Sequence, residues 1–354
     1  MNIKPVEWKN SCLLLIDQRL LPQEEKKIIC SSYREVTDAI ECMAVRGAPA
    51  IGISGAYAAV LAAISYGDQT GDDFYAALRQ ACCDIERARP TAVNLKHSMD
   101  LVRVLIDNHQ TLNTPIDQVI NLIEKAAIQL HTEDAENNVR MANIGLECIT
   151  AMSSHPVTVM THCNTGALAT AALGTALGVI KLLHAHHQLK EVFVNETRPW
   201  MQGSRLTVWE MEKEHIPYRL ICDSAAAFVM QTMGVQWLVV GADRITANGD
   251  VANKIGTYSL AIAAKYHGVK VMVVAPKTTW DLTLESGEMI PIETRAASEL
   301  VQWRDVSFSL LEANGYNPVF DVTPHHLIDV LVCEDGYIES PTKEKITAFF
   351  DKKR

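Results

Sequence analysis

One cysteine and one aspartate stand out because each directly follows a short apolar run that is typical of a buried strand. Cys163 lies in the stretch Thr-His-Cys-Asn-Thr-Gly, just after residues 157–161. Asp243 lies in the stretch Gly-Ala-Asp-Arg, just after residues 237–240. The carboxyl ends of parallel strands meet at one edge of a sheet, where ligands bind. A thiolate that acts as a base or nucleophile, together with a carboxylic acid, can move a proton and break a C–O bond. This chemistry indicates a sugar isomerase.

Both residues also have structural interpretations. Residues 164–166 are expected to open a helix, whose positive end would favour the thiolate of Cys163, but a buried spectator cysteine fits the position as well. His162 adjoins the cysteine, and neighbouring strand residues point to opposite faces of a sheet. We therefore favour a structural His162 over an ion pair with Cys163. Asp243 acts as a general acid if apolar surroundings keep it protonated, or else it caps a helix or pairs with Arg244.

Several polar residues have the position and chemistry to bind a phosphate or a polyol. Arg46 and Arg89 each stand shortly before a proline and a predicted helix, where backbone N–H groups and a guanidinium can bind an anion. A single such corner would more often be helix punctuation, but two of them suggest a phosphate clamp. The candidate binding residues are Arg46, Gly47, Ala48, Arg89, Gln202, Asn253 and Lys254. Asn253 and Lys254 are expected to open a helix, which leaves an N-cap with a solvated lysine as the alternative.

Length and composition narrow the class of protein. The chain has 354 residues, of which 48% are hydrophobic, so we expect one large or two smaller folded domains and do not expect disorder. A net charge of -10 argues against general nucleic-acid binding. The nine cysteines form no CxxC pair and fit reduced thiols. Residues 1–8 lack a signal core, and the apolar run 51–64 is too short and too rich in small residues for a bilayer. We expect a soluble, cytoplasmic protein without a membrane or nucleic-acid partner.

No cofactor or metal is expected. The sequence contains neither GxGxxG nor GxxxxGK[ST], so nicotinamide and nucleoside-triphosphate binding lack support. His184, His186 and His187 lie close together in the chain, but no third ligand or carboxylate accompanies a pair on one helix face.

Apolar periodicity divides the chain into two styles. Residues 1–125 predict a small, mostly helical domain, and residues 126–354 alternate strands with helices, which predicts a doubly wound parallel sheet. The first part has a strand at 12–17 and helices at 33–45, 50–66, 74–88 and 91–109, and an amphipathic stretch at 116–152 leads into the second. The second part has strands at 157–161, 191–195, 218–222, 237–240 and 270–275, with helices near 167–182, 204–214, 225–233 and 255–267.

With these motifs, the chain resembles the methylthioribose-1-phosphate isomerases of methionine salvage. The matching stretches cover nearly the whole chain: residues 45–52, 89–95, 161–166, 195–199, 202–203, 241–245, 253–257 and 317–324. The resemblance implies a helical N-terminal domain, a Rossmann-like C-terminal domain and a homodimer. It also implies that Cys163 and Asp243 are the catalytic pair and that the seven candidate binding residues contact the substrate. Residues 280–287 look less typical of the family, which could alter substrate preference.

The resemblance therefore predicts conversion of 5-methylthioribose 1-phosphate, an aldose, into 5-methylthioribulose 1-phosphate. One alternative is a related isomerase of 5-deoxyribose 1-phosphate or ribose 1,5-bisphosphate, although a second phosphate would need a further basic cluster. Another is a non-enzymatic regulatory subunit, because the same fold serves in the guanine-nucleotide exchange factor of eukaryotic translation initiation. The presence of both Cys163 and Asp243 argues against a purely scaffolding role.

Overall fold

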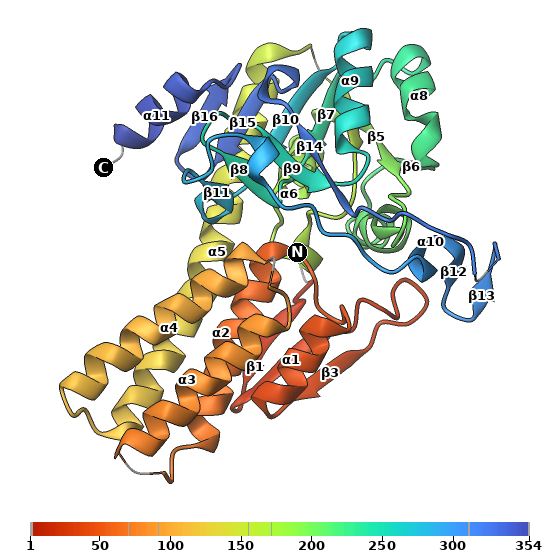
Figure 1. Ribbon diagram of the computed structural model, residues 1–354. Helices are drawn as coiled ribbons and strands as arrows, with labels where there is room; N and C mark the ends of the chain where they lie inside the picture. The colour runs from red at the N-terminus through yellow and green to blue at the C-terminus, as the bar shows by residue number, and fades with distance from the viewer. Residues whose placement is uncertain are drawn as a thin grey trace. The chain divides into compact units, whose positions relative to one another are not determined.

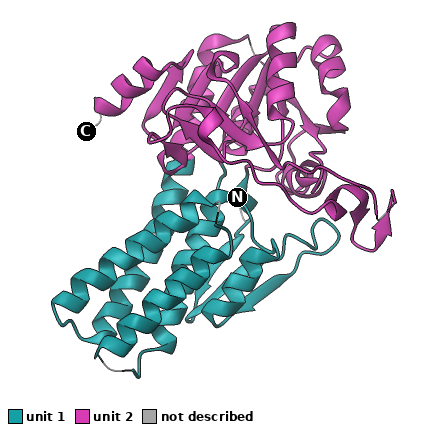
Figure 2. Cartoon of the chain, viewed as in Figure 1, with its two compact units in different colours: residues 1–138, 166–174 teal, residues 139–165, 175–354 magenta. Residues whose placement is uncertain are grey.

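The chain folds into two compact units (Figure 2). The structure, a computed structural model, describes residues 3–69, 71–90, 92–154, 156–170, 172–310 and 312–352. The first unit comprises Met1–Asn138 and Gly166–Gly174, and the second comprises Val139–Thr165 and Thr175–Arg354. The sequence placed a boundary between residues 125 and 126, whereas the units divide inside a long helix and the first unit also takes in a short segment from beyond it.

The helix that contains the division is α5, Ile116–Met152, which coincides with the predicted amphipathic stretch. Val119 and Ile123 belong to the hydrophobic core of the first unit. Met141 and Ile149 belong to a core of the second unit. A continuous helix carries no sequence signal at the point where its apolar residues change cores, so the boundary could not be located from periodicity.

The first unit combines helices with a small antiparallel sheet (Figure 1). Its strands, in the order β1-β2-β3, are β1 (Val6–Lys9), β2 (Cys12–Ile16) and β3 (Lys27–Cys30). Its helices besides α5 are α1 (Tyr33–Glu41), α2 (Ala48–Ser65), α3 (Gly71–Arg87) and α4 (Val93–Thr111). The expected strand and four helices are present, while the short β1 and β3 went unpredicted.

Helix α2 forms the centre of the first unit, since α1, α3 and α4 all pack against it. The apolar run 51–64 extends to 18 residues in this helix, so the expectation that it is too short for a bilayer is wrong. Among the described residues it is the one helix that is long and apolar enough to cross a membrane, and 78% of it is buried inside the protein.

The second unit is built on a seven-stranded sheet in the order β16-β15-β10-β7-β4-β5-β6. Its strands are β4 (Val157–Thr161), β5 (Leu189–Asn195), β6 (Tyr218–Ile221), β7 (Trp237–Val240), β10 (Lys270–Val274), β15 (Val330–Cys333) and β16 (Gly336–Glu339). All neighbours pair in parallel except β15 and β16, which are antiparallel. The five predicted strands lie side by side, and the protein is therefore a mixed α/β protein with a parallel sheet.

Helices of the second unit pack against both faces of this sheet. One core joins alternate strand residues to the end of α5, α6 (Ala176–Ala185) and α7 (Val208–Lys213). The other core joins the intervening strand residues to α8 (Ala226–Thr232), α9 (Thr257–His267) and α11 (Lys343–Asp351). Strands buried on both faces become continuously apolar, which is why β4 and β7 were recognisable in the sequence.

A second, smaller sheet lies outside the predicted pattern. It has the order β11-β8-β9-β14 and comprises β8 (Arg244–Thr246), β9 (Val251–Lys254), β11 (Trp280–Asp281) and β14 (Phe320–Thr323). Further along the chain, α10 (Ser298–Val301) precedes a hairpin of β12 (Gln302–Trp303) and β13 (Val306–Ser307). These strands are short and contain polar residues, so they lack the continuous apolar run that made β7 recognisable.

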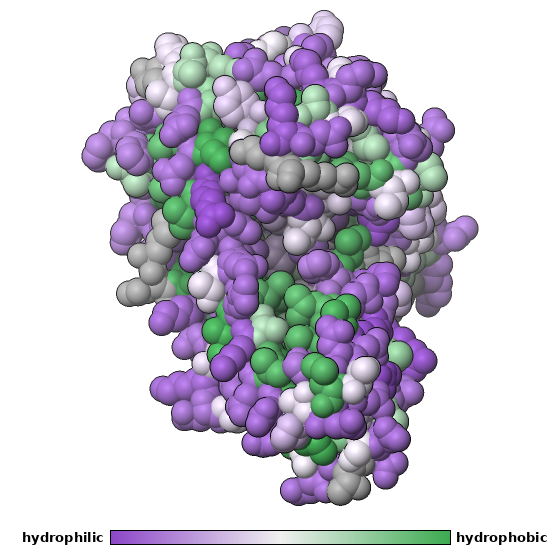
Figure 3. All heavy atoms as spheres, turned by 90° about the vertical axis from the view of Figure 1, so that its left-hand side faces the viewer, coloured by the Kyte–Doolittle hydropathy of each residue, from purple (hydrophilic) through white to green (hydrophobic). Residues whose placement is uncertain are grey.

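The face of the protein drawn in Figure 3 is largely hydrophilic, with apolar side chains gathered over the helical unit. Exposed apolar residues of that unit include Ile64, Val104, Leu112 and Ile128. Single exposed apolar residues are normal on protein surfaces, so none of them marks a binding site by itself.

Candidate active site

Cys163 and Asp243 follow two strands that are neighbours in the large sheet. Strands β4 and β7 pair in parallel, with Val159 opposite Trp237. After β4 the chain adds β5 and β6 on one side, and after β7 it adds β10 on the other side. The strand order therefore reverses between β4 and β7. In open α/β sheets this reversal, at the carboxyl ends of the strands, is the place where ligands bind.

The backbone of Cys163 is held in an unusual conformation. Its φ is 64°, in the left-handed region that residues other than glycine rarely adopt. Its N–H donates to the hydroxyl Oγ1 of Thr197 at 2.8 Å. The hydroxyl of Thr207 donates to the carbonyl of Cys163 at 2.5 Å. Hydrogen bonds on both sides of the residue thus fix the turn that presents the thiol.

The expectation that a helix opens just after Cys163 is wrong. Ala167–Ala169 form a single 3-10 turn, and α6 begins only at Ala176. Residues 166–174 belong to the first unit, and the chain re-enters the second unit where the N–H of Thr175 donates to the carbonyl of Thr165 at 2.8 Å. A helix dipole therefore does not act on the thiol, because the apolar run that suggested a helix packs in the other unit.

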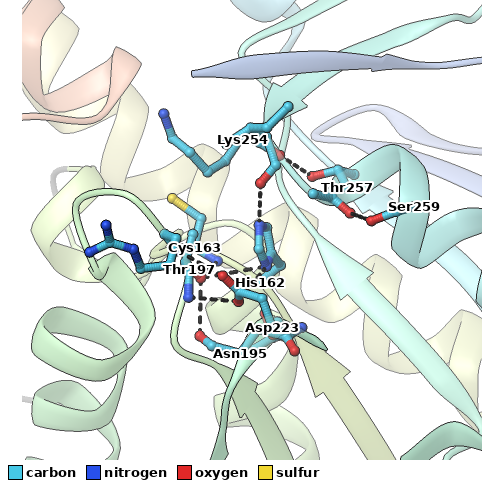
Figure 4. A network of polar contacts seen from close by, with 12 residues as sticks. His162, Cys163, Asn195, Thr197, Asp223, Lys254, Thr257 and Ser259 are labelled. Carbon is cyan, nitrogen blue, oxygen red and sulfur yellow. Dashed lines mark hydrogen bonds and ion pairs between the residues drawn. The ribbon is translucent and has the colours of Figure 1, made fainter. Parts of the chain in front are cut away.

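The buried side chain of Lys254 is the basic group near the thiol instead. Burial lowers the pKa of this lysine, whereas the negative charges of Cys163 and Asp243 act to raise it. Its Nζ donates to the carbonyl of Val319 at 2.9 Å and lies 4.2 Å from the ring centre of Phe320. In Figure 4 the thiol and the ammonium lie on the same side of the polar network. An ammonium in this place favours the thiolate form of a cysteine.

Asp243 stands at the start of the hairpin formed by β8 and β9. Its N–H donates to the carbonyl of Ala252 at 2.9 Å, so the hairpin brings Asp243 close to Asn253. Arg244 forms an ion pair with Asp281 at 3.6 Å, and the interpretation of Asp243 as a partner of Arg244 stays a prediction.

Asn253 and Lys254 do not open a helix as predicted. They are the last two residues of β9. A left-handed turn at Gly256, with φ 103°, separates this strand from α9, which begins at Thr257. The side-chain amide of Asn253 donates to the hydroxyl of Thr257 at 3.1 Å. The sequence pattern did not separate the short strand β9 from the helix α9 that follows it closely.

Gln202 precedes a turn of π-helix, Gly203–Thr207, in the segment after β5. The side chain is buried, and its Oε1 has no hydrogen-bond partner among the described residues. At Gly203 a Cβ would lie 1.7 Å from the carbonyl oxygen of Asn195, so only glycine fits there. A buried acceptor without a partner costs free energy, which a hydroxyl group of a ligand would recover.

Arg46, Gly47, Ala48 and Arg89 lie in the first unit. The Nε of Arg46 donates to Oε1 of Gln18 at 3.1 Å, which holds the guanidinium in place. Gly47 has φ 95°, and Ala48 is the first residue of α2. Arg89 is half-buried after α3, while Thr91 in its predicted corner lies outside the described residues. The interpretation of these residues as a phosphate clamp stays a prediction.

His162 has the contacts of a structural histidine. It is fully buried, and burial lowers its pKa. Its Nε2 lies 2.8 Å from the carbonyl of Ile255, which can only accept, so Nε2 carries the proton. Its Nδ1 is 4.0 Å from Oδ1 of Asp223. A neutral ring at that distance forms no ion pair.

Sequence reasoning assigned no role to Thr197, Thr207 and Asp223. Thr197 and Asp223 follow β5 and β6 at the same edge of the sheet as Cys163, and this position is the signal that could have found them. Thr207 lies in the π-helical turn, which has no signature in the sequence. Within the described parts of the chain, no group of three or more His, Cys, Asp or Glu side chains could hold a metal ion.

Comparisons with known proteins agree over the full length of the chain. Residues 44–340 match the initiation factor 2 subunit family, IF-2B. The chain is 49% identical to the methylthioribose-1-phosphate isomerase of Pseudomonas aeruginosa (strain UCBPP-PA14), over 99% of this chain and 97% of that protein. It is 48% identical to the isomerase of the same name from Stutzerimonas stutzeri (strain A1501), with the same coverage.

Two solved structures are similar as well. The crystal structure of 5-methylthioribose 1-phosphate isomerase from Pyrococcus horikoshii OT3 has a TM-score of 0.92 at 39% identity, covering 99% of this chain and 97% of that one. The translation initiation factor eIF-2B, subunit delta, from A. fulgidus has a TM-score of 0.86 at 36% identity, covering 99% and 100%.

Proposed function

The chain belongs to the methylthioribose-1-phosphate isomerase family, and from this premise we propose that Cys163 and Asp243 are its catalytic pair. The protein is an aldose–ketose isomerase of methionine salvage, which converts 5-methylthioribose 1-phosphate into 5-methylthioribulose 1-phosphate. One observation carries the proposal for the pair. The two residues follow neighbouring parallel strands where the strand order reverses, and the charges of both act on the buried Lys254.

Asp243 is assigned the role of general acid. The anomeric oxygen of the substrate carries phosphate, so the sugar ring cannot open in the way that a free hemiacetal does. A proton must reach the ring oxygen while its bond to C1 breaks. For this role Asp243, which is half-buried, must carry its proton when the substrate binds, and Lys254 nearby would stabilise the carboxylate that remains after the proton is transferred.

Cys163 is assigned the transfer of hydrogen from C2 to C1. In one route its thiolate removes the C2 proton to give an enol phosphate and then returns the proton to C1, while the C2 hydroxyl gives its proton back to the Asp243 carboxylate and becomes the carbonyl. In the other route hydride moves directly from C2 to C1, and Cys163 accepts the proton of the C2 hydroxyl. Proton NMR of the product formed in deuterated water distinguishes them, because exchange with solvent puts deuterium at C1 only in the first route.

The phosphate and the hydroxyl groups of the substrate need fixed partners, because both routes require a dry site and a held sugar. For the phosphate we propose Arg46, Arg89 and the backbone N–H groups at Gly47 and Ala48. For the rest of the sugar we propose Gln202, Asn253 and Lys254. The buried guanidinium of Arg46, held by Gln18, and the unpartnered Oε1 of Gln202 support these assignments.

We further propose a Rossmann-like, doubly wound second unit and a cytoplasmic homodimer. Helices on both faces of the parallel sheet support the first of these. Exposed Tyr258, Ile262 and Tyr266 recur every four residues along α9, and this apolar stripe supports an association of two copies. Sedimentation of the wild-type protein and of an Ile262→Glu variant tests the dimer, which should be weakened by the buried charge.

Substitution of the two catalytic candidates tests the function. Cys163→Ser and Asp243→Asn should each lower kcat by about 10²–10⁴-fold while circular dichroism shows an intact fold. Cys222→Ser is the matched control, because Cys222 follows β6 of the same sheet but is exposed, and turnover of this variant should equal that of the wild type. Near wild-type turnover in either catalytic variant refutes the pair.

The substrate is tested with a panel of sugars. We expect 5-methylthioribose 1-phosphate to give the highest kcat/KM, ahead of 5-deoxyribose 1-phosphate and ribose 1,5-bisphosphate. A higher value for either of the other sugars would move the assignment to a related isomerase. Absence of turnover with all three would contradict isomerase activity.

A further inference from the structure

We propose that Asp223 and Thr197 are positioning residues that hold Cys163 in its left-handed conformation. The carboxylate of Asp223 fixes the turn at Thr197, and the hydroxyl of Thr197 fixes the backbone of Cys163. This inference rests on the proposed role of Cys163 and deepens it, because it names the side chains that aim the thiol without taking part in the reaction.

The two turns in question are both strained. Cys163 has φ 64° and Thr197 has φ 62°. A left-handed conformation is uncommon for any residue with a Cβ and is a genuine outlier for a β-branched one such as threonine. Backbone of this kind persists only where the surroundings determine it, and it gathers at active sites. Two such residues joined by one hydrogen bond therefore call for a cause outside either turn.

Asp223 provides that cause for the turn at Thr197. Its Oδ1 accepts the N–H of Thr197 at 2.8 Å, and its Oδ2 accepts the N–H of Arg198 at 2.7 Å. A carboxylate that accepts hydrogen bonds from two consecutive N–H groups stabilises the backbone turn in which both groups point the same way. Both oxygens of Asp223 are used on the backbone, which favours a positioning role over contact with a ligand.

Thr197 passes the constraint on to Cys163. Its side chain is fully buried, and its Oγ1 accepts the N–H of Cys163 at 2.8 Å. The same hydroxyl donates to the carbonyl of Asn195 at 3.0 Å, so its single proton is occupied. The chain of contacts thus runs from the end of β6 to β5 to β4, three neighbouring strands (Figure 4).

The left-handed turn decides where the thiol points. In an extended strand, side chains alternate strictly between the two faces of the sheet. The positive φ of Cys163 interrupts this alternation directly after β4, and the thiol then lies on the side of Lys254 (Figure 4). Without the hydroxyl of Thr197, Cys163 would lose the bond to its N–H and relax toward ordinary backbone, which would turn the thiol away from Lys254 and Asp243.

The central test of the positioning role replaces Thr197 with valine, which has nearly the same shape but no hydroxyl group. Thr197→Val should lower kcat with 5-methylthioribose 1-phosphate by about 100-fold, as expected for a misplaced reacting group, with little change in KM. The pH profile of Cys163 alkylation by iodoacetamide, followed by mass spectrometry of its peptide, should shift to higher pH as the thiol leaves the ammonium. Thr197→Ser keeps the hydroxyl and should restore both kcat and the profile.

Thr161→Val is the matched control. Thr161 is equally buried, on β4, and its Oγ1 donates to the carbonyl of Val239 at 2.8 Å, so the variant loses one buried hydrogen bond that does not lead to Cys163. It should retain the wild-type alkylation profile. Asp223→Asn carries the test if Thr197→Val does not fold, because its side chain is 32% exposed and it still offers one acceptor. It should shift the profile in the same direction by a smaller amount.

The outcomes separate this inference from the proposed function. An unchanged kcat and alkylation profile in Thr197→Val overturn the inference, as does an equal loss in Thr197→Ser or an equal shift in Thr161→Val. Alkylation needs no substrate, so a shift in Thr197→Val supports the positioning role even if Cys163→Ser retains turnover, a result that would refute only the catalytic pair. Loss of turnover in Cys163→Ser with no effect in Thr197→Val would refute only the positioning role.

Discussion

Two turns of this protein depart from ordinary backbone by different means. At Gly47, before α2, φ is 95° and a Cβ would lie 2.5 Å from the Cα of Ala169, so only glycine fits. At Cys163, after β4, φ is 64° and hydrogen bonds to the Thr197 hydroxyl and from the Thr207 hydroxyl impose the conformation. The turn at Gly47 depends on the absence of a side chain, whereas the turn at Cys163 depends on hydrogen bonds to other residues. Chemistry explains the difference, because position 163 needs a side chain that glycine does not have.

The largest effect on stability is expected at the turn that relies on residue type. Gly47→Ala should lower the free energy of unfolding by at least about 1–3 kcal/mol from backbone strain alone, with a further loss from the overlap with Ala169. Urea unfolding of the full chain measures the change. Gly268→Ala is the control, since Gly268 has φ 69° but nothing within 4 Å of the added Cβ, and it should lose only about 1–2 kcal/mol. Equal losses of unfolding free energy in the two variants would show that the close approach of Ala169 does not require glycine at position 47.

Acid should affect the turn at Cys163 through its neighbour His162. Burial lowers the pKa of His162 from 6.5, so the folded protein binds this proton less tightly than the unfolded chain does. The free energy of unfolding should therefore fall as the pH drops below 6.5, by up to about 1.4 kcal/mol per pH unit. Urea unfolding at several pH values should show a smaller fall in His162→Gln.

Asp321 makes the free energy of unfolding depend on pH in the opposite direction, so its contribution must be separated from that of His162. Burial raises its pKa to about 6, so its contribution is fully present at low pH and is lost as the pH rises through that value. The contribution is common to the wild type and His162→Gln and cancels in their difference. A difference that does not depend on pH would contradict the proposed burial of a neutral His162.

The smallest effect distinguishes the two turns most directly. Glycine adopts a left-handed backbone freely, whereas alanine does not, so Cys163→Gly should be more stable than Cys163→Ala by about 1 kcal/mol. Both variants should lack isomerase activity, because neither carries a thiol. Urea unfolding of the pair measures the difference. A more stable alanine variant would mean that residue 163 does not require the left-handed conformation.

Much of the frame of the protein was readable from apolar patterns. The predicted strands at 157–161 and 237–240 coincide with β4 and β7, and the amphipathic stretch coincides with α5. The expectation of a helix at 167–182 was partly wrong. The apolar residues of segment 166–174 pack in the first unit and do not continue the helix. The family assignment is confirmed by full-length relatives, while the roles of Cys163 and Asp243 stay proposals.

The amino-acid sequence by itself determined which strands are buried on both faces and that a thiol and a carboxyl group follow two of them, because burial and alternation are written in consecutive residues. Only the tertiary structure decided the left-handed turn at Cys163, the hairpin that carries Asp243 to Lys254, and the chain from Asp223 through Thr197. Those features depend on hydrogen bonds and charges between residues far apart in the chain, such as the 34 positions that separate Cys163 from Thr197. No local pattern records such a contact.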